Sequence, residues 1–271
     1  MDIPTITSSQ NRQLIRVRRL VARPKECRRE GLLVADGVHL VQEALKARLR
    51  CAGLFVTAGQ RTAEIEQIVH EAEQHRLALY PVLPHLFRAL SPVESPQGVL
   101  GLFERPRWER SALWKDLAED DRGHLVILDG VQDPTNVGSI LRSAQAAGIR
   151  GLITTPHTVD PFHHRALRAA MGAAFHLPIV VEEPVLPLLS TLRNVGYQTL
   201  ALSAQGDRSI ADLPRGRFAF LFGAEGSGLA SGVEAQCALR VKIPMARDID
   251  SLGVAAAAAV AFFTVYLRDP A

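Results

Sequence analysis

The sequence is poor in cysteine and aromatic residues and has no long apolar run. Three cysteines, Cys27, Cys51 and Cys237, are scattered through 271 residues with no Cys-x-x-Cys pair and no histidine at metal-ligand spacing, which predicts neither a zinc site nor a disulfide framework. No apolar run approaches the roughly 20 residues that a membrane helix needs, and the first ten residues lack the features of a signal peptide. We therefore expect a cytoplasmic protein that binds neither a metal nor a membrane.

Length and composition are those of a globular protein with room for two modest domains. The hydrophobic content of 47% is ample for packed cores. The net charge of +3 fits a polyanionic partner without identifying one, since many proteins are mildly basic. The distribution of charge along the chain is more informative than its total.

Positive charge is concentrated near the N-terminus, where residues 11–29 hold eight Arg or Lys and one acidic residue, Glu26. A helix over 11–22, capped by Ser8 or Ser9, places Leu14, Val17 and Val21 on one face. The opposite face then carries four arginines: Arg12, Arg16, Arg19 and Arg23. Two interpretations stay open, a phosphate-binding face for RNA and a solvated basic face.

The rest of the chain alternates between strand and helix patterns. Apolar strands are expected at 31–37, 51–59 and 98–104, with helices at 39–47 and 62–76, which gives an α/β unit of about 100 residues. Residues 106–122 are expected to be a linker or a connecting helix. From residue 124 onward, five strands alternate with helices, and this order favours a parallel sheet covered by helices. Ligands of such sheets bind beyond the carboxyl ends of the strands.

Three polar or glycine-rich segments follow strands at those ends. The first, residues 136–142, opens a helix on Asn136 and ends on Arg142, and Asn136 suits either a simple N-cap or a close ligand approach. The second, residues 220–229, places Glu225 among glycines. Its spacing is neither GxGxxG nor GxxxxGK, which disfavours a nicotinamide-dinucleotide dehydrogenase.

The carboxylate of Glu225 repels phosphate and suits a ligand with donor groups or positive charge, and a solvated loop residue is an equally open interpretation. The third segment runs from Val241 to Met245 and, after a short gap, from Ser251 to Val254 into an alanine-rich helix. Ser251 or Asp250 can cap that helix, which is otherwise an ordinary buried helix.

In their order and spacing, the three segments closely resemble the signature motifs of the SpoU (TrmH-type) family of SPOUT RNA 2'-O-ribose methyltransferases. Residues 160–179 are similar to the connecting motif of that family, and residues 8–14 and 32–45 resemble its N-terminal substrate-binding domain. The resemblance covers nearly the whole chain, and the ordered set is far more specific than any one segment.

The resemblance implies the fold, the cofactor and the partners. Residues 1–105 would be a small α/β ribosomal-protein-like RNA-binding domain, 106–122 a linker, and 123–271 a parallel-sheet SPOUT domain with a deep trefoil knot. S-adenosylmethionine would be the cofactor, held by the backbone around Gly223, Ile243 and Leu252 with Met245 beside them. The family works as homodimers whose site is completed across the two-fold interface, and the apolar helix over 254–267 is a candidate interface element.

The resemblance also assigns roles to individual residues. Arg142 matches the essential arginine of the family; because an arginine is a poor base near neutral pH, we expect it to bind phosphate and stabilise alkoxide charge. Asn136 and Glu225 match residues that orient this arginine and the loops, and Ser251 matches a serine of the cofactor loop. The expected RNA-binding residues are Arg12, Arg16, Arg19 and Arg168.

The chain departs from the family pattern at two positions. Gly253 stands where the family usually has Asn, and Ala170 stands where the connecting motif usually has Ser. We expect an active enzyme, because the four catalytic candidates remain. The N-terminal domain resembles that of ribosomal RNA modifiers, so we expect large-subunit ribosomal RNA as the substrate. The alternatives are an enzyme acting on transfer RNA and an RNA-binding paralogue with little or no methyltransferase activity.

Overall fold

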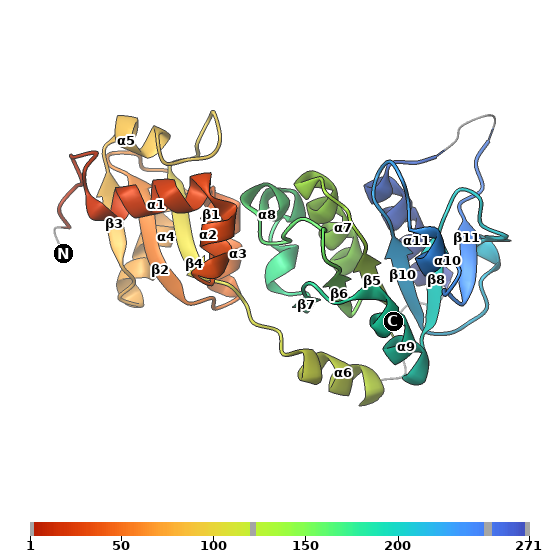
Figure 1. The fold of residues 1–271 in the computed structure, drawn as a ribbon. Coiled ribbons are helices and arrows are strands. Elements are labelled where there is room, and N and C mark those ends of the chain that lie inside the picture. The colour runs from red at the N-terminus through yellow and green to blue at the C-terminus, as the bar shows by residue number, and fades with distance from the viewer. Residues whose placement is uncertain (1–2, 120–122, 247–250, 269–271) are drawn as a thin grey trace. The chain divides into compact units, whose positions relative to one another are not determined.

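The computed structural model describes residues 3–119, 123–246 and 251–268 (Figure 1). The chain divides into two compact units. The N-terminal unit contains residues 1–106 and 162–175, and the C-terminal unit contains residues 107–161 and 176–271. The domain boundaries expected from the sequence stay a prediction.

The N-terminal unit is built on a mixed four-stranded sheet in the order β1-β4-β2-β3. Its strands are β1 (Leu32–Asp36), β2 (Cys51–Thr57), β3 (Leu79–Val82) and β4 (Val99–Glu104). Strand β4 is antiparallel to β1 and β2, whereas β3 is parallel to β2. The helices are α1 (Arg12–Ala22), α2 (Pro24–Arg29), α3 (Val38–Lys46), α4 (Ala63–Gln74), α5 (Pro84–Arg88) and α8 (His164–Ala170), with a 3-10 turn, η1 (Ala173–Phe175).

Helix α1 forms where the sequence predicts it, with a different cap. Asn11 is the N-cap, because its side chain accepts a hydrogen bond from the Gln13 N–H, so the predicted cap at Ser8 or Ser9 is wrong. Leu14, Val17 and Leu20 are buried, and they pack in one cluster with residues of β1, β2 and β4. Leu20 rather than Val21 completes the buried stripe.

Residues 162–175 group with the N-terminal unit, where α8 packs against β1. The helix ends in two left-handed residues, Met171 with φ 51° and Gly172 with φ 90°. The His39 Nε2–H donates to the Met171 carbonyl at 3.2 Å. A Cβ on Gly172 would lie 2.8 Å from the side chain of Glu43 on α3, so this turn is closely packed.

The C-terminal unit holds a seven-stranded parallel sheet in the order β7-β6-β5-β10-β8-β11-β9, which confirms the predicted parallel α/β architecture. Its strands are β5 (Leu125–Leu128), β6 (Gly151–Thr154), β7 (Ile179–Val180), β8 (Gln198–Leu202), β9 (Arg208–Ser209), β10 (Phe218–Phe222) and β11 (Leu239–Lys242). The sequence pattern missed β7 and β9, since two residues are too few to show a period.

Helices cover both faces of this sheet. They are α6 (Arg110–Glu119), α7 (Pro134–Ala146), α9 (Val185–Asn194), α10 (Ser231–Glu234) and α11 (Val254–Arg268), with a 3-10 turn, η2 (Ile210–Asp212). On the central strand β10, successive side chains pack against helices on opposite faces of the sheet. Ala219 and Leu221 pack in one cluster with α6 and α9, whereas Phe220 and Phe222 meet Phe262 of α11 edge to face, with ring centroids 5.4 and 5.8 Å apart.

Two further findings concern the described residues of both units. No helix among the described residues is long and apolar enough to cross a membrane. Within the same residues, no group of three His, Cys, Asp or Glu side chains is placed to hold a metal ion. The trefoil knot stays a prediction, since the order of the strands does not by itself trace the threading.

Candidate functional site

A cavity of about 530 Å³ lies at the carboxyl ends of β8, β10 and β11 in the C-terminal unit. Parallel α/β sheets bind their ligands at this edge, and the volume of the cavity is typical of a small-molecule site. Seven of the eight residues predicted for catalysis or cofactor binding line it: Asn136, Gly223, Glu225, Ile243, Met245, Ser251 and Leu252. Residues more than 100 positions apart therefore meet in one site.

The two loops at the mouth of the cavity are tied together by Glu225. Its Oε1 accepts a hydrogen bond from the Asn136 side-chain amide at 3.0 Å, and its two oxygens accept from the backbone N–H groups of Gln132 and Asp133 at 3.4 Å. Asp133 is the N-cap of α7 and accepts from the Thr135 N–H, so the predicted N-cap role of Asn136 is wrong. Asn136 lies in the first turn, where its amide is free to bind Glu225.

The carboxylate of Glu225 is held in its charged form. Partial burial raises its pKa, but the hydrogen bonds from Asn136 and from backbone N–H groups outweigh this effect, and the net pKa is lower than usual. The side chain remains largely exposed to solvent. Glu225 is therefore a fixed negative charge at the mouth of the cavity.

The loop after β10 requires glycine at residue 223. Ala224 and Gly228 pair through two backbone hydrogen bonds of 3.2 and 2.9 Å, and this turn brings Gly228 back onto Gly223. A Cβ at residue 223 would lie 2.1 Å from the Gly228 carbonyl carbon and 2.2 Å from the Leu229 nitrogen. Backbone atoms therefore line the cavity here, as expected for a site that recognises its ligand through amide and carbonyl groups.

The loop after β8 forms another wall of the cavity and lies directly on β11. The Ser203 N–H donates to the Val241 carbonyl at 2.9 Å, and the Asp207 N–H donates to the Arg240 carbonyl at 3.1 Å. A Cβ on Gly206 would fall 2.4 Å from the Val241 carbonyl carbon. Ser203 and Gln205 of this loop line the cavity, and no sequence signal singled them out.

The segment before α11 supplies the last wall. Ser251, Leu252 and Gly253 line the cavity just ahead of the helix, which begins at Val254. Asp250, the other candidate cap of this helix, lies outside the described residues. A Cβ on Gly253 would have no atom of the described residues within 4 Å, and its backbone angle is not left-handed, so a side chain fits among these residues.

Arg142 is not among the residues that line the cavity. Its side chain is exposed on α7, beyond Asn136 along the same helix. Within the described residues it makes no hydrogen bond or ion pair through its side chain. The geometry of one chain thus brings together every proposed catalytic residue except the arginine.

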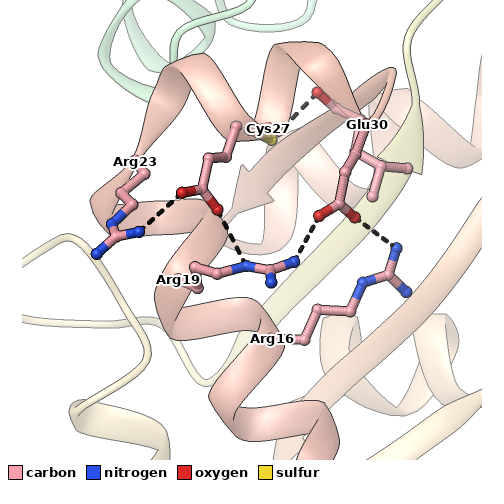
Figure 2. Close-up of polar contacts among 7 residues, drawn as sticks. Arg16, Arg19, Arg23, Cys27 and Glu30 are labelled. Carbon is pink, nitrogen blue, oxygen red and sulfur yellow. Dashed lines mark hydrogen bonds and ion pairs between the residues drawn. The ribbon is translucent and has the colours of Figure 1, made fainter.

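Three of the four arginines predicted to share the basic face are engaged in ion pairs with Glu26 and Glu30, and Figure 2 shows these pairs in a row. Arg16 pairs with Glu30 at 2.9 Å, and Arg19 contacts both Glu30 and Glu26. Arg23 pairs with Glu26 at 2.8 Å. The sequence pattern did not predict these pairs, because it assigned no position to the two carboxylates.

Arg12, by contrast, is exposed at the first position of α1, and its side chain makes no ion pair among the described residues. Arg168 is exposed on α8 and lies near Asp36 at the end of β1. Burial raises the pKa of Asp36, while a hydrogen bond from Ser91 and the charge of Arg168 oppose the rise. The four predicted RNA-binding arginines therefore differ in whether a nearby carboxylate already offsets their positive charge.

Ala170, the second departure from the family pattern, is buried in α8 and does not line the cavity. A serine there would need a hydrogen-bond partner for its hydroxyl inside the packed helix. Of the two departures, Gly253 alone changes the lining of the cavity.

Comparison with known proteins identifies both units. Residues 123–263 match the SpoU rRNA Methylase family, and residues 11–101 match the MRM3-like substrate binding domain. The chain is 32% identical to an uncharacterized tRNA/rRNA methyltransferase of Mycobacterium tuberculosis, over 86% of this chain and 80% of that protein.

Two further relatives have more specific descriptions. The 23S rRNA (guanosine(2553)-2'-O)-methyltransferase RlmP of Bacillus subtilis is 27% identical, over 87% of this chain and 89% of that protein. The crystal structure of an AdoMet-bound rRNA methyltransferase from Sinorhizobium meliloti superposes with a TM-score of 0.85 at 26% identity, covering 99% of both chains.

Proposed function

Because this chain belongs to the SpoU rRNA methylase family, we propose that it methylates a ribose 2'-hydroxyl of large-subunit ribosomal RNA. It is an S-adenosylmethionine-dependent RNA 2'-O-methyltransferase. The choice of ribosomal over transfer RNA is supported by the relatives named for 23S rRNA and rRNA methylation. Such a substrate agrees with the cytoplasmic location expected from the sequence, which stays a prediction.

The observation that carries the proposal is the cavity formed by the three motif segments. Its volume of about 530 Å³ and its backbone wall at Gly223 fit the adenosine part of S-adenosylmethionine. Gly223, Ile243 and Leu252 would hold that part through backbone groups, with Met245 closing the apolar side. When bound, the cofactor supplies an electrophilic methyl group on a sulfonium.

The protein contributes position and charge to the transfer. The hydrogen bonds of Glu225 fix the start of α7 relative to the loop after β10, so the wall of the cavity and the helix that carries Arg142 keep one geometry. Ser251 lies at the cofactor loop. The Arg142 cation would bind the phosphate beside the target ribose and stabilise the negative charge that develops on the 2'-oxygen, which needs no deprotonated arginine.

We further propose that the enzyme is a homodimer in which each Arg142 serves a composite site. Arg142 does not line the cavity of its own chain, and in the proposed dimer a second chain would complete the constellation. Helix α11 offers an apolar surface for the contact, since Val260 is 40% and Leu267 is 74% exposed. These two residues are seven positions apart and share one side of the helix.

The N-terminal unit is proposed to supply RNA affinity, as expected for a substrate-binding domain. Arg12 has a free cation, whereas Arg16 and Arg19 already neutralise Glu26 and Glu30. Arg12 should therefore contribute more to phosphate binding than either paired arginine. Arg168 is proposed as a further RNA contact from α8.

A second candidate function is favoured by Gly253, which leaves the cavity without the side chain usual in the family. An RNA-binding paralogue with little methyl transfer would have the same fold. Mapping of 2'-O-methyl groups in RNA from cells with and without the gene tests both. Loss of one ribosomal RNA methyl group supports the proposed function, whereas an unchanged map favours the paralogue, and loss from transfer RNA overturns the choice of substrate.

A further inference from the structure

The charged groups that line the cavity are all of one sign. Among the described lining residues there are two glutamates, Glu225 and Glu234, and no lysine or arginine. Glu225 is already hydrogen-bonded to Asn136 and to backbone N–H groups. The carboxylate of Glu234 has no hydrogen bond or ion pair to any described residue. Glu234 lines the cavity and is half buried, so its carboxylate is available to a donor group of a bound ligand.

The position of Glu234 is fixed by its backbone. It is the last residue of α10, its N–H donates to the Ala230 carbonyl at 3.0 Å, and the preceding Val233 is buried. It also lines a second cavity of about 540 Å³ that includes Cys237. Burial raises the pKa of Cys237 to about 11; a hydrogen bond with Thr199 opposes the rise, and the charge of Glu234 adds to it.

The cofactor carries complementary charge. S-adenosylmethionine has a sulfonium, an α-ammonium and one carboxylate, a net charge of about +1 by the usual ionisation of these groups. The ammonium has three N–H donors and forms short charge-assisted hydrogen bonds with carboxylates. The sulfonium has no N–H or O–H, and its methyl group must face the RNA hydroxyl. Glu225 and Asn136 already occupy the mouth of the cavity, next to the helix of Arg142.

We propose that Glu234 binds the α-ammonium group of S-adenosylmethionine and thereby selects ligands that carry this cation. The proposal rests on the cofactor of the proposed function. It assigns Glu234 a part in cofactor binding rather than in methyl transfer. A contact of this kind forms equally with cofactor and demethylated product, since both keep the ammonium.

Binding calorimetry on the full-length protein tests the assignment with three ligands. S-adenosylmethionine has the sulfonium and the ammonium, S-adenosylhomocysteine has the ammonium alone, and 5'-methylthioadenosine has neither. Glu234→Gln should weaken binding of the first two by about tenfold or more, the scale of a lost charge-assisted hydrogen bond. Binding of 5'-methylthioadenosine should stay within about twofold of wild type, which also shows that the variant is folded.

Glu109→Gln is the matched control, because it removes the same charge from an exposed residue outside the cavity. It should leave all three affinities unchanged. Equal weakening of all three ligands by Glu234→Gln would point to the ribose or to the fold and overturn the proposal. Weakening of S-adenosylmethionine alone would assign Glu234 to the sulfonium and overturn it too, as would no weakening. A wild-type protein that binds none of the three would instead remove the cofactor, and with it the proposed function.

Discussion

Asn136 in the first turn of α7 donates its side-chain amide to Glu225 in the loop after β10, with 3.0 Å between Nδ2 and Oε1. The two residues are 89 positions apart in the sequence. Their contact joins the first and second motif segments. The two segments that resemble the family in sequence therefore also touch in the folded chain. It also explains why a carboxylate lies among glycines, since the backbone N–H groups of Gln132 and Asp133 converge on the same side chain.

Glu225→Gln should lower the rate of methyl transfer by about tenfold or more, because an amide accepts fewer and weaker hydrogen bonds than a carboxylate. The pKa of Glu225 is lowered, so the network should be intact above the ordinary glutamate pKa of about 4.3 and be lost only as pH falls through the lower folded value. Between pH 5 and 8, the pH–rate profiles of variant and wild type should therefore have the same shape. A variant with the wild-type rate would contradict this role.

Gly223→Ala should abolish cofactor binding, since its Cβ would lie 2.1 Å from the Gly228 carbonyl carbon and force the cavity wall to shift. Gly232→Ala is the control, because a Cβ at that position in α10 has no atom within 4 Å and Gly232 does not line the cavity. Calorimetry with S-adenosylmethionine should show no binding to the first variant and unchanged binding to the second. Normal binding by Gly223→Ala would show that the loop is not a rigid wall.

Arg12→Ala should weaken RNA binding and lower the slope of log K against log salt concentration by about 0.7 to 0.9, the change for one lost phosphate contact. Arg16→Ala should have a smaller effect, because Arg16 is paired with Glu30. Filter binding at four or five salt concentrations measures both.

Glu30→Gln separates the two possible roles of the paired arginines. If its carboxylate competes with RNA phosphate for Arg16 and Arg19, the variant should bind RNA more tightly than wild type. Weaker binding would mean that the row of ion pairs positions the arginines for RNA. For the preceding prediction, equal slopes of log K against log salt concentration for wild type and Arg12→Ala would mean that Arg12 binds no phosphate and that this face of α1 is only solvated.

Much of the C-terminal architecture was predictable, because apolar strands such as 218–222 and helices such as α7 have clear periods. The resemblance carried by the motif segments also predicted seven residues that line the cavity, although it predicted Arg142 for the same site. Ion pairs on α1 and the hydrogen bonds of Glu225 were not predictable, since they depend on where separate elements come together. Glu234 carries no local signal at all, and only the folded chain places it in the same cavity as Glu225.

Gly253→Asn should be accommodated without strain and should raise methyl transfer if the missing amide limits the present enzyme. The site has open space, and the backbone there accepts an L side chain. Steady-state kinetics on the mapped RNA should show a gain of about twofold or more with unchanged thermal stability, within the usual range for a surface substitution. A loss of activity would mean that the enzyme uses the open space, for example to admit its substrate.

The central claim is methyl transfer to a ribose with Arg142 as the stabilising cation, and single-turnover transfer of labelled methyl groups from S-adenosylmethionine to ribosomal RNA tests it most directly. Nucleosides from the digested RNA should carry the label on the 2'-oxygen, and Arg142→Ala should lower the rate by about a hundredfold or more without changing cofactor affinity. Arg142→Lys keeps the positive charge but loses the planar guanidinium. A rate near wild type would mean that the charge is sufficient, and a large loss would mean that the guanidinium geometry is needed. Label on a base, no label with any of the three proteins, or a wild-type rate in Arg142→Ala would contradict the account.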